Sequence, residues 1–145
     1  MEKTCGIYFR GDDIYVSTMS QTNIGFWIGT EPRFKLKSTD SAEALGSTVM
    51  SALDASRQNI PTPPRLRSVN DDLLKFVGFK TLSSFERGTI QFVITWTENG
   101  VNILPTRQGA RGSHDLLPNE SVDCKPDPEE VGQVLQKLVS ERQSS

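Results

Sequence analysis

The fold is decided by the stretch Phe34-Lys35-Leu36-Lys37, which leads into Ser41-Ala42-Glu43-Ala44-Leu45-Gly46-Ser47-Thr48-Val49. The same pattern returns as Val122-Asp123-Cys124-Lys125, which leads into Asp127-Pro128-Glu129-Glu130-Val131-Gly132-Gln133-Val134-Leu135. Each copy predicts a short strand followed by a capped helix, because Ser41 and Asp127 can accept hydrogen bonds from first-turn amides and Pro128 suits the first helical position. Each helix carries glycine in its second turn. Glycine costs about 1 kcal/mol there relative to alanine, so the matched glycines predict close backbone packing.

Short alternating runs predict the other strands of a sheet. Arg10-Gly11-Asp12-Asp13 separates two β-rich runs and predicts a hairpin, because glycine and aspartate tolerate a tight turn. Asn99-Gly100 predicts a second hairpin for the same reason. The predicted strands are Ile7–Phe9, Ile14–Val16, Ile24–Ile28, Phe34–Lys37, Thr89–Thr97, Val101–Leu104 and Val122–Lys125, with Pro105 ending the sixth.

Apolar residues at spacings of three and four mark the two main helices, which follow Ser41 and Asp127. Each apolar stripe is narrow, so each helix is expected to lie on a sheet with its other face in solvent. A short helix is predicted over Ser68–Phe76 and ends at Gly78, and Phe85 anchors a further single turn. The fold class is therefore α+β, an antiparallel sheet with helices packed mainly on one face.

A proline-rich segment divides the chain without separating two domains. Asn59–Arg65 contains three prolines and predicts a stiff, extended linker. It joins halves of about 1–58 and 68–145. A chain of 145 residues fits one domain of ordinary size, so we expect residues 1–145 to form a single domain.

Composition narrows the functional classes. The formal net charge of −2 argues against direct binding of nucleic acid, which favours basic proteins. No run is long and apolar enough to predict a membrane span, and Met1–Gly6 starts a strand-like pattern rather than a secretion signal. Cys5 and Cys124 form neither a metal-binding pair nor a disulfide framework, so reduced thiols and a cytoplasmic location are expected. The sequence predicts no cofactor and no metal site.

One loop offers a catalytic hypothesis. It contains the single histidine of the chain, His114, beside Asp115, with Arg107 and Arg111 nearby. In this hypothesis His114 is a general base oriented by Asp115, and an arginine stabilises a developing anion. Adjacent side chains rarely meet in such a geometry. The alternative is an ordinary exposed loop, and the sequence predicts no assembled enzyme active site.

Paired carboxylates offer a binding hypothesis. Asp12 and Asp13 suit a turn, and Asp71 and Asp72 suit a helix start, so both pairs have structural reasons to be present. Neighbouring side chains diverge, which argues against a catalytic carboxylate pair. Exposed carboxylates can still steer a basic partner. Trp27 and Trp96 could anchor an interface where exposed, although their alternating strands place at least one in the core.

Four segments, taken in order, carry a resemblance to a known family. The first is the opening hairpin, Gly6-Ile7-Tyr8-Phe9-Arg10-Gly11-Asp12-Asp13-Ile14-Tyr15-Val16. The second is Ala42-Glu43-Ala44-Leu45-Gly46, and the third is Val77-Gly78-Phe79-Lys80-Thr81-Leu82-Ser83-Ser84-Phe85. The fourth is the ending, in which Leu117-Pro118 and then Cys124 precede Asp127-Pro128-Glu129-Glu130-Val131-Gly132. Together they resemble the immunity proteins of bacterial contact-dependent growth inhibition systems. The resemblance covers most of the chain and includes no catalytic signature.

The resemblance implies a non-catalytic cytoplasmic protein that binds and neutralises the C-terminal toxin domain of a contact-dependent growth inhibition surface protein. It further implies that the toxin is a nuclease, with transfer RNA as one expected substrate. Immunity proteins diverge together with their toxins, so the resemblance passes on no contact residues. The expectation that Asp12, Asp13, Asp71 and Asp72 bind the toxin rests on charge and predicted exposure alone.

Two alternatives from other classes stay open. The chain could be a small hydrolase or nuclease that uses the His114 loop, or an adaptor that pairs a sheet edge with a peptide. The sequence does not decide the oligomeric state. It also does not decide whether an inhibitor of this kind would cover the toxin's active site or bind beside it.

Overall fold

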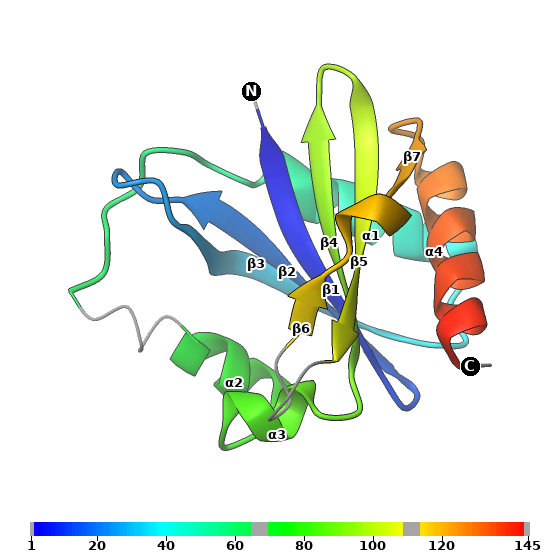
Figure 1. Cartoon of the computed structure of the whole chain (residues 1–145), viewed down its shortest axis with the longest axis horizontal. Helices are drawn as coiled ribbons and strands as arrows, with labels where there is room; N and C mark the ends of the chain where they lie inside the picture. The colour runs from blue at the N-terminus through cyan, green and yellow to red at the C-terminus, as the bar shows by residue number, and fades with distance from the viewer. Residues whose placement is uncertain (1, 65–69, 109–113, 144–145) are drawn as a thin grey trace.

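The computed structural model describes residues 2–64, 70–108 and 114–143 of the chain. The strands form an antiparallel sheet with helices packed on it (Figure 1). In chain order the elements are β1 (Lys3–Arg10), β2 (Asp13–Gln21), β3 (Trp27–Lys37), α1 (Ala42–Asp54), α2 (Asp71–Val77), α3 (Leu82–Glu86), β4 (Ile90–Thr97), β5 (Gly100–Gln108), β6 (His114–Leu116), the 3-10 helix η3 (Pro118–Glu120), β7 (Val122–Cys124) and α4 (Pro128–Gln143).

Strands from both halves of the chain share one sheet. The strand order is β3-β2-β1-β4-β5-β6, and β7 also pairs with β5. The central strand β1 pairs with β2 through Ile7 and Val16 and with β4 through Ile7 and Phe92. All of these strand pairs are antiparallel. The predicted α+β class with an antiparallel sheet is therefore confirmed.

The two long helices, α1 and α4, cover one face of the sheet. Side chains alternate between faces along a strand, so Cys5, Ile7 and Phe9 of β1 point toward these helices while Tyr8 points away. The main core lies between the sheet and the helices, and its fully buried members include Val16, Leu45, Val49, Leu53, Phe92, Ile94, Ile103, Val131 and Leu135. Burial of each large side chain contributes about 1.5–3 kcal/mol, so this face supplies most of the hydrophobic stabilisation.

The matched glycines lie where α1 and α4 touch. A Cβ atom at Gly46 would overlap the carbonyl oxygen of Pro128, the first residue of α4. A Cβ atom at Gly132 would overlap the carbonyl oxygen of Ala42, the first residue of α1. The second turn of each helix therefore rests on the first turn of the other. The predicted close packing is confirmed, and each copy of the repeated unit packs on the other.

The predicted caps of both helices are present. The Ser41 hydroxyl accepts a hydrogen bond from the Ala44 amide at 3.1 Å. The Asp127 carboxylate accepts one from the Glu130 amide at 3.0 Å. These oxygens satisfy amides of the first turn that have no partner within the helix. The caps thus fix the starts of the helices at the residues where their backbones touch.

The short helices α2 and α3 pack on the opposite face of the sheet. Phe85 is fully buried there, with its ring centre 5.3 Å from that of Tyr8 and 5.9 Å from that of Tyr15. Leu73 and Val77 of α2 complete this second cluster. Gly78 ends α2 as predicted, with φ of 83°, a conformation that favours glycine.

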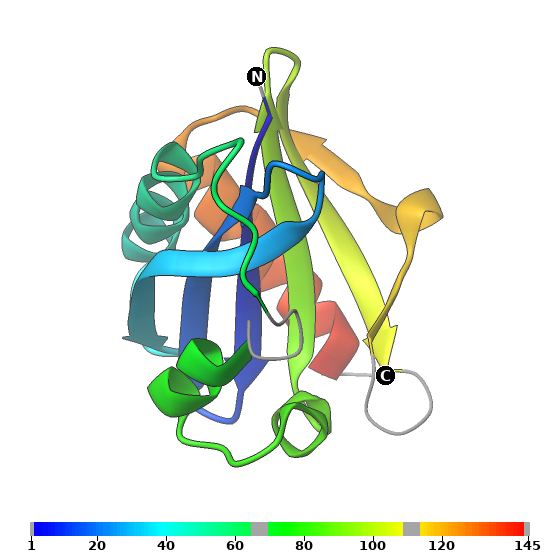
Figure 2. The ribbon, with the colours of Figure 1, turned by 90° about the vertical axis from the view of Figure 1, so that its left-hand side faces the viewer.

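The segment after α1 carries the chain from one face to the other (Figure 2). Ile60 forms a parallel bridge with Thr22, just beyond β2. The Gln21 amide donates to the Arg57 carbonyl at 2.9 Å, and the Gln21 carbonyl accepts from the Ile60 amide at 3.1 Å. The extended linker predicted from its prolines is therefore tied to the sheet at its start. Residues 65–69, which include the first two positions of the predicted helix Ser68–Phe76, lie outside the described residues.

Two predictions about β3 are wrong. The strands expected at Ile24–Ile28 and Phe34–Lys37 are not separate, because β3 runs continuously from Trp27 to Lys37. Ile24, Gly25 and Phe26 lie before it and are not in a strand. Its pairing with β2 shifts between Ser17 and Thr18, opposite Glu31 and Pro32, which leaves an irregularity in the ladder. Proline has no amide hydrogen to donate, so Pro32 accounts for the interruption in the pairing of β3 with β2. In the sequence this interruption was interpreted as a break between two strands.

The predicted end of β5 at Pro105 is also wrong. The carbonyl of Pro105 accepts a hydrogen bond from the Leu117 amide at 3.0 Å, so its backbone polar groups point away from β4. The missing amide of proline therefore removes no hydrogen bond between β4 and β5. The strand continues to Gln108, and His114–Leu116, expected in a loop, pairs back on it as β6.

Candidate functional site

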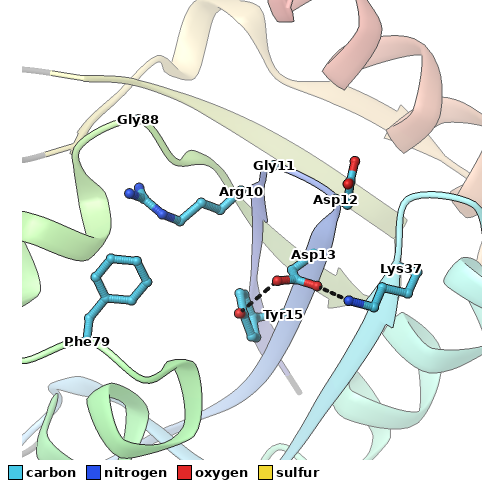
Figure 3. A pocket seen from close by; sticks show the side chains of 8 residues that line it. All are labelled: Arg10, Gly11, Asp12, Asp13, Tyr15, Lys37, Phe79 and Gly88. Carbon is cyan, nitrogen blue, oxygen red and sulfur yellow. Dashed lines mark hydrogen bonds and ion pairs between the residues drawn. The ribbon is translucent and has the colours of Figure 1, made fainter.

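The predicted carboxylates Asp12 and Asp13 line a hollow at the β1–β2 turn. Its volume is about 570 Å³, and its lining residues are Arg10, Gly11, Asp12, Asp13, Tyr15, Lys37, Phe79 and Gly88 (Figure 3). Asp12 is exposed at the turn, while Asp13 begins β2 and is half-buried. The hollow thus lies between the turn, the end of β3 and the segments on either side of α3.

Asp13 is bound within the molecule. Its carboxylate lies 2.6 Å from the Nζ of Lys37 and 4.0 Å from the Nζ of Lys35, and it accepts a long hydrogen bond from the Tyr15 hydroxyl at 3.5 Å. The hydrogen bond from Lys37 holds the pKa of Asp13 below its usual value, and the charge of Lys35 adds to this effect. The same hydrogen bond raises the pKa of Lys37. Asp13 is therefore less available to a partner than its sequence position indicated.

We expect this pair to make stability depend on pH at both extremes. The folded pKa of Asp13 is lowered, so its contribution is present above its unfolded pKa and is lost as pH falls through the folded value. The folded pKa of Lys37 is raised, so its contribution is present below its unfolded pKa and is lost as pH rises through the folded value. Urea midpoints measured across pH should decline less at both ends in Asp13→Asn than in the wild type.

The control for that measurement is Asp12→Asn, in the same turn. Asp12 makes no ion pair within the described residues, so its loss should leave the pH profile close to that of the wild type. Equal profiles for Asp13→Asn and the wild type would contradict the assignment of this pair. The effect of an exposed pair is small, so the comparison requires low salt.

Arg10 was interpreted from the sequence as a turn residue, but its side chain connects the end of β1 to the α3 segment on the other side of the hollow. Its guanidinium donates to the Phe85 carbonyl at 3.0 Å, to the Thr89 hydroxyl at 3.2 Å and to the Arg87 carbonyl. Its central carbon also lies 4.6 Å from the centre of the Phe79 ring. These contacts fasten the α3 segment to the end of β1. No local pattern around Arg10 indicated this role, because its partners lie more than seventy residues away.

The other predicted carboxylates lie at a different place. Asp71 and Asp72 are exposed in the first turn of α2, where they complement the helix dipole. Asp72 lines a second hollow of about 510 Å³, together with Glu31, Arg33, Lys75 and Phe76. The four predicted residues therefore do not line one hollow, and both hollows contain equal numbers of acidic and basic side chains.

Two further hollows lie at the far end of the sheet, around Trp96. One has a volume of about 660 Å³ and reaches Glu130 at the start of α4, and the other has a volume of about 290 Å³ and reaches Asp54 at the end of α1. Trp96, Thr97 and Glu98 line both of them. The prediction that at least one tryptophan sits in the core is wrong, because Trp27 and Trp96 are both half-buried. Trp96 packs against the main core from outside it.

The His114 hypothesis stays untested at its histidine, because the side chain of His114 lies outside what the structure describes. In β6, His114 pairs through its backbone with Gln108, and Asp115 pairs with Arg107. Asp115 and Arg107 are exposed, and Arg111 lies outside the described residues. Among the described residues, no three His, Cys, Asp or Glu side chains gather so that they could hold a metal ion. In the same part of the chain, no helix has the length and apolar character needed to cross a membrane.

Both cysteines are free thiols. Cys5 is buried in the main core, and burial raises its pKa well above the usual range. Cys124 is half-buried, and burial together with the charges of Glu130 and Asp123 raises its pKa to about 11. A nucleophilic cysteine needs a lowered pKa, so neither environment favours thiolate chemistry.

The α+β arrangement, with α1 and α4 on one face and α2 and α3 on the other, occurs in known structures. No protein-family model matches the chain, and no curated protein matches it. A protein of unknown function from Neisseria meningitidis shares the fold with a TM-score of 0.79 and 22% identity, over 98% of this chain and 95% of that one. A chain of the CdiA-CT/CdiI toxin and immunity complex from Yersinia pseudotuberculosis shares it with a TM-score of 0.77 and 17% identity, over 97% of both chains. At these identities the likeness establishes the fold.

Proposed function

We propose that this chain is a non-catalytic immunity protein that binds and neutralises the C-terminal toxin domain of a contact-dependent growth inhibition surface protein. The observation that carries the proposal is the match of its fold, over nearly the full length of both chains, to a chain of a toxin and immunity complex. The segments that resemble immunity proteins give independent support from the sequence. In this proposal residues 1–145 act as one domain in the cytoplasm, and the toxin is a nuclease, with transfer RNA as one expected substrate.

The surface chemistry is consistent with binding rather than catalysis. The hollows at the β1–β2 turn and beside α2 each contain two acidic and two basic residues. Of the basic residues, Lys37 pairs with Asp13 and Arg33 donates a hydrogen bond to Ser17. A stable complex requires an interface of about 1,600 Å² with a few buried anchors. In our proposal the carboxylates Asp12, Asp13, Asp71 and Asp72 steer a basic toxin domain toward the protein. Asp13 should contribute least of the four, because it is paired with Lys37.

The edge-pairing alternative is less favoured. β3 is an edge strand, but its ladder is interrupted at Glu31 and Pro32 and its outer part carries Lys35 and Lys37. Proline, irregular pairing and lysine are devices by which edge strands avoid pairing with other chains.

In our proposal the neighbouring upstream gene encodes the toxin domain, and co-expression with that domain tests the proposal. Cells that express this domain alone should stop growing, and cells that also express the present chain should grow. The two purified proteins should form a one-to-one complex by size-exclusion chromatography. A toxin domain from an unrelated system is the control and should be neither bound nor neutralised. Absence of binding to the folded upstream domain would overturn the proposal.

A further inference from the structure

The end of the sheet that carries Trp96 lies far from the β1–β2 turn (Figure 1). β1 pairs with β4 from Lys3, opposite Trp96, to Phe9, opposite Ile90. At about 3.3 Å per residue, the two ends are about 20 Å apart. The surface around Trp96 is therefore separate from that of Asp12 and Asp13.

Negative charge is in excess only at the Trp96 end, among the four hollows described above. Four acidic residues line the two hollows around Trp96, namely Asp54, Glu98, Asp123 and Glu130. Only two basic residues line them, Lys3 and Lys125. The other two hollows contain matched charges. A partner that fits the Trp96 end must therefore bring positive charge.

Three of these carboxylates already have internal partners. Asp54 lies 3.6 Å from the Nζ of Lys3. Asp123 accepts a hydrogen bond from the Asn102 side chain at 2.9 Å, and Glu130 accepts one from the Lys125 amide at 2.5 Å.

Glu98 differs from them. It is exposed in the β4–β5 turn, and within the described residues it makes no hydrogen bond and no ion pair. It also lines both hollows, as Trp96 does. Glu98 is therefore the carboxylate that an approaching cation can reach without displacing an existing contact.

We propose that Trp96 and Glu98 form the anchor point for an arginine or lysine side chain of the protein partner. The cationic group lies against the indole and pairs with the Glu98 carboxylate. Acidic residues alone would not define such a site, and it is the indole of Trp96 that does so. Tryptophan is the strongest aromatic partner of a cation and is enriched among the residues that dominate binding energy. This inference rests on the proposed function, in which the partner is the toxin domain.

Binding kinetics of the upstream toxin domain to single variants test the inference. Glu98→Lys should weaken binding by at least about tenfold, mainly through faster dissociation. Trp96→Leu keeps an apolar side chain against the core but removes the ring, and it should also speed dissociation. Since Trp96 contacts the core, thermal unfolding must first confirm that this variant is folded. Glu98 lies in an exposed turn, so Glu98→Lys tests the inference without altering a side chain that contacts the core.

The matched control is Glu141→Lys, which makes the same charge change at an exposed position near the other end of α4. It should keep the wild-type dissociation rate, and Asp12→Lys should slow association without changing dissociation. If the wild type binds and Glu98→Lys dissociates at the wild-type rate, the anchor assignment is wrong while the proposed function stands. If the wild type does not bind, the proposed function fails and the inference falls with it.

Discussion

Replacing Gly46 with alanine is expected to lower the free energy of unfolding by about 3 kcal/mol, near the upper end of overpacking effects. The added methyl group would overlap the carbonyl oxygen of Pro128, which belongs to a backbone and cannot move aside as a side chain could. The two helices must therefore separate. Gly132→Ala should have a similar effect, because its methyl group would overlap the carbonyl oxygen of Ala42. Urea denaturation of each variant measures the loss.

A double variant separates this explanation from a general effect of altering a helix. Once one methyl group has forced the helices apart, the second has less to displace, so Gly46→Ala with Gly132→Ala should cost less than the sum of the single changes. Ser47→Ala and Gln136→Ala are the controls, at exposed positions of α1 and α4, and should be nearly neutral. Stabilisation of either glycine variant, as helix propensity alone would predict, would refute the proposed backbone contact.

Phe85→Ala is expected to cost about 3–4 kcal/mol, because Phe85 is fully buried at the centre of the second cluster. Its ring contacts Tyr8, Tyr15 and Phe79, which together hold α2 and α3 against the sheet. The loss should be local. Amide hydrogen exchange should become faster in α2 and α3, while amides of β1 and β4, which belong to the main core, keep most of their protection.

Phe76→Ala is the control for this prediction. Phe76 lies in α2 and contacts Tyr15, but it is 36% exposed and should contribute far less. Equal loss of stability in the two variants would contradict the view that Phe85 is the centre of the cluster. A uniform rise in exchange across the sheet would contradict the view that this cluster unfolds separately.

The sequence predicted the parts of the fold that depend on local chemistry. The caps at Ser41 and Asp127 use side chains within three residues of the amides they accept from, so a local pattern reveals them. The glycines were informative because each one is unfavourable in a helix and needs a tertiary reason. The sequence predicted that both glycines pack closely against another backbone. It did not predict that their contacts are Pro128 and Ala42, in the other copy of the repeated unit.

The parts that could not be predicted depend on residues distant in sequence. Asp13 appeared to be a free carboxylate, because Lys37 approaches it only after β2 and β3 have paired. The fastening role of Arg10 needs the α3 segment to be in place. The interruption in β3 at Pro32 looked like a loop, since a single strand with an irregularity and two short strands have similar local patterns. The two hollows that Glu98 and Trp96 line likewise depend on where α1 ends and where α4 begins.

The pairing of β1 with β4 and the contact of α1 with α4 also govern the order of events during synthesis. Val131 and Leu135 of α4 complete the core that β1 and α1 begin, yet they are translated after every strand of the sheet. Until they leave the ribosome, the apolar faces of β1 and α1 have no full cover. Long-range pairing of this kind also slows folding. The core is therefore completed only after α4 has left the ribosome, and a message truncated before α4 yields no finished core.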